Sequence, residues 1–564
     1  MCLYVVASPA PTWLVFCEVF QREVETPCAP PLGWDSRSEV LTFHLIIVDT
    51  RTGSGQIGTM TQGRFKLPCW IERHPLLTVI LIAIAVRAVA VVFSKGFIHS
   101  DDHYDTVMIA YDWLRNGFWG ANGFLRWRQE PSDMIGRFPL YVMSLWAMMK
   151  ALTLCGVQAL NSMMYVVRAV HAAISLIPVW VAFKVTVWTT QSKRWGMLAA
   201  LVVGLNFMMP FLGVRNLIEM VGGNIWMLTI IAVYQYERNR RESCLVLAGL
   251  AAGLAWMIRF QMASAAIPIP FILWWQYRSV KPALSFAVGV AVMLFASGLA
   301  DLYWLGRFGG STITNITMNA GLPALYKTIP GLFPLILLLA LVPPWSFVSA
   351  VAMFRKSFLM RHAVLVGSSF FFVLFHLAMA NQQERFVFPI IPAFLLMSVL
   401  AVWHKKEDKG YVLKSPRLLH WLVGSSVVLD LVLLIFLTPG YGHKGLIEPV
   451  VRIRAEEPSA HVLFIQPGIH KWIPISYGGE AMSRFYVREW DALDRARSDG
   501  GAFDYVVLLP RDAADLNAYE DSARTVCGAI VPDFEVAPSC YDWLLHKANP
   551  HHNPDYAAFV YKSK

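Results

Sequence analysis

Apolar residues run along most of the chain in stretches of about 20, the length that crosses a bilayer as a helix. Pro or Gly interrupts several stretches, and we expect about twelve helices in all. The pattern predicts an all-α, polytopic membrane domain over residues 60–437. The predicted spans lie near residues 76–95, 137–155, 164–187, 196–212, 216–235, 244–259, 261–277, 283–303, 329–352, 362–380, 386–403 and 418–437.

Two segments on either side of the first span depart from the pattern of spanning apolar stretches. Residues 1–59 lack both a strong amphipathic period and the basic start of a signal peptide. We expect them to form a poorly ordered N-terminal extension. Residues 97–136 follow the first span, hold many charges and aromatic rings, and form the first outer loop.

The C-terminal tail, residues 438–564, is polar enough to be a small extramembrane domain. The stretches at 461–467 (HVLFIQP) and 503–510 (FDYVVLLP) are typical of buried strands that end at Pro. Short helices are expected at 489–498 and 511–525. The tail is therefore predicted to be an α/β module on the outer face of the membrane.

Composition agrees with the membrane assignment and excludes one other class. Hydrophobic residues make up 56% of the chain and charged residues only 15%, against about 25% charged in soluble domains. The net charge of +10 would suit nucleic acid. However, Lys and Arg gather in short loops between apolar stretches, as the positive-inside rule expects. The lipid bilayer is the expected partner, and nucleic acid is not.

The same loops give the expected topology. From Lys193 onward the basic loops fall on one side, which we take as cytosolic. Upstream of Lys193 the predicted spans contain one crossing too many or too few. The basic loops are Lys193–Arg194, 237–242, 278–281, 355–361 and 404–417, and the opposite, outer side holds residues 97–136, 306–328, 381–385 and 438–564.

The first outer loop opens with a crowd of acidic and imidazole side chains, namely His99, Asp101, Asp102, His103 and Asp105. Oxygen and imidazole ligands suit Mg, Mn or Zn, which makes a metal site one interpretation. A carboxylate at the bilayer edge could instead deprotonate an acceptor hydroxyl as a general base. The third interpretation is a solvated loop in which one Asp caps the helix that follows. The pattern alone leaves all three open.

Cations follow in the same loop. Arg126, Arg128 and Arg137 lie in RWRQEPSDMIGRFPLY. Guanidinium forks suit phosphate, and a lipid-phosphate sugar would present one at this depth. Ordinary anchoring at the headgroups is the alternative for any one of them.

Polar residues within or beside the apolar stretches are informative because a charge there is costly and usually functional. Arg215 and Glu219 are four residues apart, which predicts that they share a helix face, on which they could pair. Arg259, Asp301, Glu384 and Arg385 complete this set of site candidates. A transporter could use such residues as an ion path.

Two cysteines of the tail, Cys527 and Cys540, leave two possibilities. They could form a disulfide if the tail faces an oxidising compartment, or remain free thiols.

Taken in order, these motifs resemble those of the dolichyl-phosphate-mannose-dependent mannosyltransferases of glycosyltransferase family 22, which have the GT-C membrane fold. The likeness covers roughly residues 70–440. His99-Ser100-Asp101-Asp102 resembles an H-P-D-E-like signature, and Arg137-Phe138-Pro139 resembles the entry to the family's second span. Arg215-Asn216-Leu217-Ile218-Glu219 loosely matches an R-T-L-S-N-S-x-E-type segment.

Three later segments continue the resemblance. Ile258-Arg259-Phe260, followed by Pro268 and Pro270, resembles the family's R-P stretch, and Asp301-Leu302-Tyr303-Trp304 resembles its D-x-x-x-Y-G-x-W segment. Glu384-Arg385-Phe386 with Pro389 and Pro392 is similar to the motif H-K-E-x-R-F-x-x-P-x-x-P. Here Asn381-Gln382-Gln383 replaces His-Lys-Glu, and the acid is displaced to Glu384.

The resemblance implies a distant member that performs an inverting sugar transfer without a metal or other cofactor. It implies Asp101 as the base on the acceptor hydroxyl, with Asp102 as the second candidate. It implies Arg259, Arg385 and, more weakly, Arg137 as ligands of the donor phosphate.

The function expected is transfer of mannose or a related hexose from a polyprenyl- or dolichyl-phosphate donor to a glycan or glycolipid acceptor. The competing hypothesis is a transporter or flippase for a lipid-linked or small polar substrate, which would favour inverted repeats with broken helices. The sequence shows no such symmetry. In a eukaryote the protein would lie in the endoplasmic reticulum membrane, and in a bacterium in the inner membrane.

Overall fold

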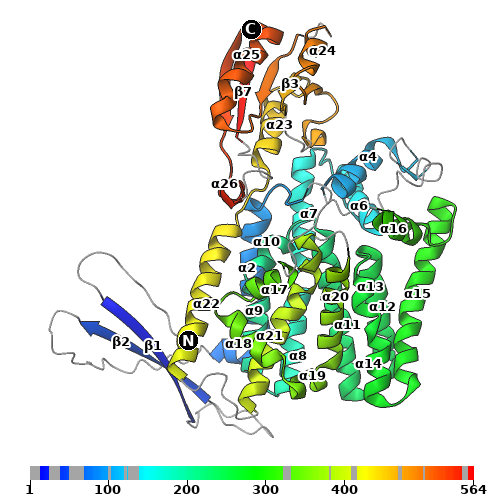
Figure 1. Ribbon diagram of the computed structural model, residues 1–564, viewed down its shortest axis with the longest axis vertical. Helices are drawn as coiled ribbons and strands as arrows, with labels where there is room; N and C mark the ends of the chain where they lie inside the picture. The colour runs from blue at the N-terminus through cyan, green and yellow to red at the C-terminus, as the bar shows by residue number, and fades with distance from the viewer. Residues whose placement is uncertain are drawn as a thin grey trace.

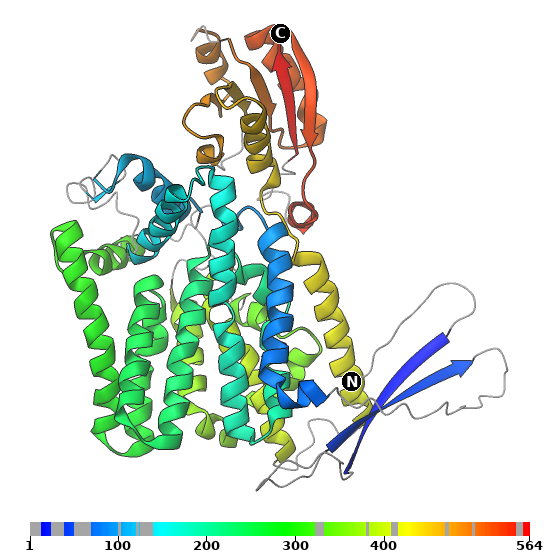
Figure 2. The same cartoon turned by 180° about the vertical axis from the view of Figure 1, so that it is seen from behind.

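A bundle of helices carries a small five-stranded domain at one end (Figures 1 and 2). This confirms the predicted fold class, an all-α membrane domain with a C-terminal α/β domain. The computed structural model describes residues 13–23, 39–49, 69–99, 103–119, 123–124, 139–321, 332–379, 383–407, 416–467, 473–498, 502–548 and 557–564.

The bundle helices follow the predicted apolar stretches closely. Of the described helices, five are long and apolar enough to cross a membrane, with α7 and α8 counted as one 31-residue span. A sixth span, bent by 118°, joins the end of α17 to α18, and four shorter apolar helices accompany it. The expectation of about twelve spans stays a prediction. The helices are α2 (Pro75–Phe93), α7 (Leu160–Ile174), α8 (Ile177–Thr190), α9 (Lys193–Leu205), α10 (Met208–Gly213), α11 (Ile218–Asn239), α12 (Glu242–Ile258), α13 (Met262–Ala266), α14 (Pro268–Tyr277), α15 (Val280–Leu305), α17 (Leu332–Ala340), α18 (Trp345–Met353), α19 (Lys356–Arg361), α20 (Ala363–Ala378), α21 (Ile391–Glu407) and α22 (Pro416–Leu437).

Burial separates central from peripheral helices. The span over residues 384–405, which contains α21, is 94% buried, whereas the spans of α2 and α15 are only 22% buried. Exposure of the apolar side chains on those two helices to water would be unfavourable, whereas contact with lipid is not. The centre of the bundle is thus apolar and protein-packed, and its periphery faces acyl chains.

One expected span, residues 137–155, was wrong: the helix in this place, α6 (Leu140–Leu154), lies outside the bundle. It lies with α4 (Ile109–Asn116) and α16 (Gly310–Gly321) at the end of the bundle that carries the C-terminal domain, and it packs against α4. Fifteen helical residues extend about 22 Å, less than the roughly 30 Å of a hydrocarbon core. With α6 outside the bundle, two crossings of the described chain remain before Lys193. The first outer loop and the loop at Lys193 then lie on opposite sides of the membrane, as the basic loops predict.

We call the two ends of the bundle the basic end and the domain end. The basic end holds the turns around residues 193, 240 and 278, where the predicted cytosolic loops lie. The domain end holds the start of α11, the end of α12 and the C-terminal domain. Every sequence-predicted outer segment that the structure describes lies at the domain end.

The C-terminal domain begins with α23 (Lys444–Glu456) and forms a sheet of order β4-β3-β5-β7-β6. Strands in the stretches 461–467 and 503–510 are confirmed, as are helices in the two expected places, α24 (Ala492–Ser498) and α25 (Leu516–Cys527). A last helix, α26 (Cys540–Ala548), lies beside α23 and α22. The strands are β3 (His461–Ile465), β4 (Ser483–Val487), β5 (Tyr505–Leu508), β6 (Ile530–Val536) and β7 (Ala558–Ser563).

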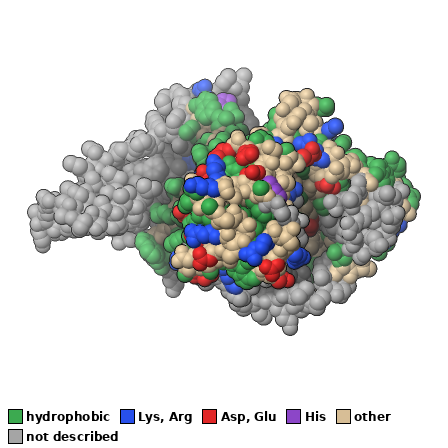
Figure 3. Space-filling model, turned by 90° about the horizontal axis from the view of Figure 1, so that it is seen from above, with side chains coloured by type: hydrophobic (Ala, Val, Ile, Leu, Met, Phe, Trp, Pro, Cys, Tyr) green, Lys and Arg blue, Asp and Glu red, His purple; other side chains and the backbone are tan. Residues whose placement is uncertain are grey.

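The direction of the strands follows from the last one. β7 ends at the tip of the domain farthest from the bundle (Figure 2), and β5 runs antiparallel to it. Because β3 and β4 are parallel to β5, the carboxyl ends of these three strands face the bundle. Seen from above, acidic and basic side chains are interspersed over the domain (Figure 3), which is typical of a soluble surface and not of a polyanion-binding face.

Two strands precede the bundle, β1 (Trp13–Glu23) and β2 (Glu39–Asp49), which pair antiparallel. The expectation that residues 1–59 form a poorly ordered N-terminal extension stays a prediction.

Candidate functional site

Three buried charged side chains meet at the domain end of the bundle. Glu219 lies in the first turn of α11, Arg259 follows α12 directly, and Arg385 lies in the 3₁₀ helix η3 (Glu384–Ile390). One guanidinium nitrogen of Arg259 is 2.8 Å from Oε1 of Glu219, and Nε of Arg385 is 3.8 Å from the same oxygen. We call these three residues the ionic cluster.

The local fold explains why these residues meet. An acidic side chain in the first turn of α11 is stabilised by the helix dipole, as is a cation just past the end of α12. Arg259 has extended backbone torsions, which end α12 and direct the chain away from its axis. The side chains of Glu219, Arg259 and Arg385 are at most 7% exposed, so the charges compensate one another in a low-dielectric setting.

Two adjacent glycines let the elements approach so closely. A Cβ at Gly222 would lie 2.9 Å from Cβ of Arg259, and one at Gly223 would lie 2.3 Å from the carbonyl oxygen of Pro389 in η3. Sequence reasoning missed this pair. A Gly-Gly step inside an otherwise apolar helix is the signal that could have indicated it.

Aromatic and amide groups line the cluster. The ring of Phe386 lies under both guanidinium groups, at 5.2 Å from Arg259 and 5.5 Å from Arg385. Nε of Arg385 donates to Oε1 of Gln383 at 2.7 Å. His376, at the end of α20, is buried with its ring 6.1 Å from that of Phe386. These contacts hold the planes of the two guanidinium groups in place.

Arg215 does not pair with Glu219 as predicted. The helix α11 begins only at Ile218, so Arg215 lies outside it and the two residues share no helical face. Instead Arg215 donates to the carbonyl oxygens of Lys95 at 3.0 Å and Gly440 at 2.5 Å. It thus joins the chain after α2 to the chain after α22.

Two further site candidates, Asp301 and Glu384, have surroundings that differ from those of the ionic cluster. Asp301, near the end of α15, accepts hydrogen bonds from the backbone N–H and the hydroxyl of Ser311 at 2.9 and 2.6 Å, and so fixes the first turn of α16. Glu384 is exposed, while Arg385 beside it is buried. Within the described chain, the structure brings Glu219, Arg259 and Arg385 together from the set of candidates.

Of the residues expected to act on the substrate, three lie outside the described residues, namely Asp101, Asp102 and Arg137, and so do Arg126 and Arg128. Their roles stay predictions. The described flanks place the loop: Phe97 and Val107 pack in one hydrophobic cluster with Ile218 and Val221, which flank Glu219. Arg215, three residues before α11 begins, bonds to the carbonyl oxygen of Lys95, so the chain just before the first outer loop lies near the start of α11.

His99 and His103 differ in their surroundings. His99 is partly buried just after α2. His103 begins a π-helical turn, His103–Met108, and its ring stacks on Phe97 at 4.9 Å and on Tyr477 of the C-terminal domain at 5.8 Å. Burial lowers the pKa of His103 to about 3, because the imidazolium would lose its hydration. A neutral, stacked His103 acts as a packing residue and offers no positive charge to an anion.

A cavity of about 710 Å³ opens where α2 and α22 end. We call it the lateral groove. Apolar side chains of both helices line it, and among them Ile435 is 74% exposed. Lys95, Lys444 and Glu448 also line the groove. Cys540 also lines the groove. Cys540 and Cys527 are both free thiols, so of the two possibilities for this pair the structure shows the free thiols and not the disulfide.

Comparison with known proteins decides the family. Residues 78–459 match the Alg9-like mannosyltransferase family. The chain belongs to this family. The resemblance to glycosyltransferase family 22 drawn from the motifs is thereby confirmed, and the family favours an enzyme over a transporter. The matched residues end before β3, so the sheet of the C-terminal domain lies beyond them.

Solved structures agree on the fold. ArnT from Cupriavidus metallidurans bound to undecaprenyl phosphate is 11% identical, with a TM-score of 0.50, over 88% of this chain and 99% of that one. The same protein in the apo state is 12% identical, with a TM-score of 0.54, over 87% and 98%. No curated protein matches the sequence. The chain is thus a multi-pass membrane glycosyltransferase with the GT-C fold.

Proposed function

We propose that the protein transfers mannose, or a closely related hexose, from a polyprenyl- or dolichyl-phosphate donor to a hydroxyl of a glycan or glycolipid acceptor. Transfer takes place at the domain end, on the lumenal or periplasmic face. The observation that supports the proposal is the ionic cluster at the domain end, in the first turn of α11, near the chain that leads into the first outer loop. A base and a phosphate site must adjoin in such a reaction.

Each group has a distinct role. Asp101, or its neighbour Asp102, takes the proton of the acceptor hydroxyl, whose oxygen forms a bond to the anomeric carbon. The bond from that carbon to the phosphate oxygen breaks, and the polyprenyl phosphate leaves with the electron pair. Arg259 and Arg385 bind the departing phosphate, because guanidinium forks match its oxygens.

Glu219 is a positioning residue in this scheme. Its carboxylate lies between the two guanidinium groups and holds them in place while neutralising part of their charge. Arg137 is the third, weaker candidate for the phosphate. The resemblance implies transfer without a metal or cofactor, so that the protein's own cations carry the stabilisation of the leaving group.

The lateral groove supports a lipid-linked substrate. Its exposed apolar wall suits isoprenoid or acyl chains, and its two lysines suit a phosphate at the same depth. The solved relative ArnT binds undecaprenyl phosphate. A polyprenyl-phosphate donor is consistent with both observations.

The test is an assay with a polyprenyl-phosphate mannose donor and membrane-expressed protein. We expect Asp101→Asn to lower transfer by about a hundredfold or more, because the hydroxyl loses its proton acceptor. Asp112→Asn is the matched control, since Asp112 lies in the same outer segment and bonds to Asn116. Full activity in both Asp101→Asn and Asp102→Asn would refute the proposed role of the loop.

A further inference from the structure

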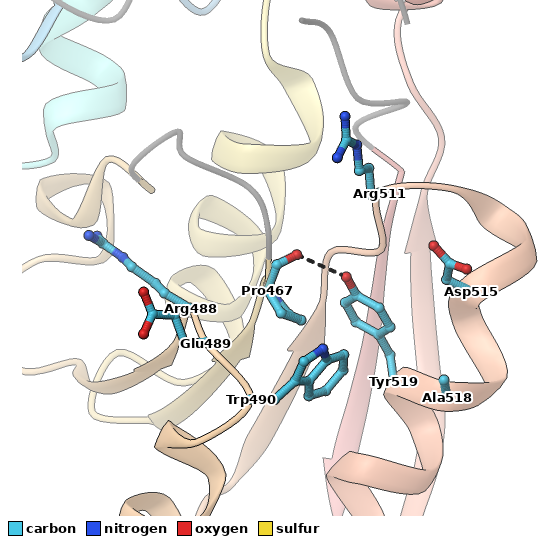
Figure 4. A pocket seen from close by; sticks show the side chains of 8 residues that line it. All are labelled: Pro467, Arg488, Glu489, Trp490, Arg511, Asp515, Ala518 and Tyr519. Atoms are coloured by element: carbon cyan, nitrogen blue, oxygen red, sulfur yellow. Dashed lines mark hydrogen bonds between the residues drawn. The ribbon is translucent and has the colours of Figure 1, made fainter. Parts of the chain in front are cut away.

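The C-terminal domain has a cavity of about 600 Å³ on the edge of its sheet that faces the bundle (Figure 4). Its walls come from the segments that follow three parallel strands. Pro467 follows β3, Arg488 follows β4, and Arg511 follows β5. We call it the sheet-edge pocket.

This position is where α/β domains bind ligands. In open sheets the crevice lies outside the carboxyl ends of the strands, where neighbouring connections leave in opposite directions. Here the chain passes from β3 to β4 on one side of β3, while β5 lies on its other side. The volume falls within the range of about 300–1,000 Å³ that small-ligand sites have.

Two aromatic rings form the floor of the sheet-edge pocket. Trp490 and Tyr519 meet edge to face, with ring centroids 5.2 Å apart. The hydroxyl of Tyr519 donates to the carbonyl oxygen of Pro467 at 3.2 Å, which holds the buried tyrosine in place. Trp490 is 45% exposed. A fixed ring beneath an exposed indole is a preorganised apolar platform.

The polar groups around this platform are balanced in charge. Figure 4 shows Arg511 and Asp515 on one side of the two rings and Arg488 and Glu489 on the other. Two guanidinium groups supply donors, and two carboxylates supply acceptors. A pocket for a phosphate or another anion would carry an excess of cations. Alternating donors and acceptors instead match hydroxyl groups, each of which donates and accepts.

We propose that the sheet-edge pocket binds neutral hexose units of the acceptor glycan. The C–H face of a sugar ring would lie on Trp490, with its hydroxyls bonded to Arg511 and Asp515. This rests on the proposed function, and it adds the class of acceptor: a glycan long enough to contact the domain while its reacting hydroxyl is at the first outer loop. The pocket is lined by segments that follow the carboxyl ends of β3, β4 and β5, and these strand ends face the bundle, as such an acceptor requires.

The experiment measures binding of two soluble probes to the full-length protein in nanodiscs by saturation-transfer NMR. The probes are a neutral manno-oligosaccharide and inorganic phosphate. We expect the wild type to bind the oligosaccharide, with Trp490→Ala weakening it about tenfold and Asp515→Asn by a similar factor. Trp543→Ala is the matched control, because Trp543 is 49% exposed in the same domain and lies outside the pocket.

Four results would overturn the proposal. They are a wild type that does not bind the oligosaccharide, equal binding by the wild type and Trp490→Ala, an equal loss in Trp543→Ala, and competition by phosphate for the same site. An unfolded variant would be recognised by its elution profile, and in that case Trp490→Phe, which keeps a ring, must restore binding.

Failure of this proposal can be told apart from failure of the proposed function. If Asp101→Asn abolishes transfer while Trp490→Ala leaves the KM for a glycan acceptor unchanged, the sheet-edge pocket is not an acceptor site and the reaction stands. If the oligosaccharide binds as expected but no polyprenyl-phosphate mannose is consumed, the pocket stands and the donor assignment fails.

Discussion

His103 links the first outer loop to the C-terminal domain through a stack of rings. Its imidazole lies against Phe97 on one side and Tyr477 on the other, and neither ring nitrogen has a hydrogen-bond partner among the described residues. Burial lowers its pKa to about 3 from 6.5. The ring is therefore neutral at neutral pH, and the stack behaves as an apolar contact.

Acid should destabilise this contact. Between pH 6.5 and 3 the unfolded chain binds a proton at His103 that the folded protein does not, so stability falls as the pH falls through this range. At about pH 5 the loss is roughly 2 kcal/mol. His103→Phe keeps a ring and removes the proton, so its thermal unfolding midpoint should depend less on pH between about 7.5 and 5. Equal pH dependence in both proteins would contradict this.

At the same scale, the sequence indicated which charged residues are buried but not which ones pair. Glu219, Arg259 and Arg385 were all site candidates, because charges in apolar stretches are costly. The pairing of Arg215 with Glu219 was wrong, since it assumed one continuous helix through residue 215. Helix boundaries depend on tertiary contacts, here the carbonyl oxygens of Lys95 and Gly440, which sequence spacing does not contain.

The helix α11 is the element that assembles the ionic cluster. At Gly222 the helix packs closely against the end of α12, and at Gly223 it packs closely against the backbone of η3. Close packing of helices through small residues is usual in membranes, where van der Waals contact drives association. The cluster thus depends on two residues without side chains.

Gly223→Ala should therefore disturb both stability and transfer. Its Cβ would lie 2.3 Å from the carbonyl oxygen and 2.6 Å from Cα of Pro389, so backbone must move. We expect a loss of about 1–3 kcal/mol in unfolding free energy and a clear drop in transfer rate as η3 carries Arg385 away. Gly204→Ala in α9 is the control, because its Cβ would make only an ordinary contact at 3.4 Å. A fully active Gly223→Ala protein would show that η3 need not pack so closely.

Most elements could be predicted and some could not, for physical reasons. The long apolar helices contact protein or lipid on every side, and the strands β3 and β5 are buried within the domain, so the sequences of both are nearly continuously apolar. β6 contains Pro532 and is mostly exposed at the sheet edge, so its pattern indicates no strand. α6 has the composition of a span, and its place beside α4 follows from length and packing, not composition.

At the scale of the whole molecule, one junction holds the bundle, the first outer loop and the C-terminal domain together. Arg215 bonds to Lys95 and Gly440, and the carboxylate of Asp542 in α26 accepts the backbone N–H groups of His443 and Lys444 at 2.8 and 3.0 Å. The junction begins at Gly440, three residues after the end of α22, and continues to Lys444, where α23 begins. The domain is thus fixed to the chain that leads into the acidic loop.

Arg215→Lys tests whether this junction sets the geometry of transfer. A guanidinium fork reaches both carbonyl oxygens at once, whereas an ammonium group on a flexible stem does not hold the same geometry. We expect hydrogen exchange to rise together in residues 94–99 and 440–446, and transfer to fall about ten- to a hundredfold as the acidic loop shifts from the cluster. Arg240→Lys, at the basic end over Tyr236, should change neither. If exchange rises in only one of the two segments, Arg215 does not couple them, and the C-terminal domain must be held over the transfer site by the His103 stack and Asp542 instead.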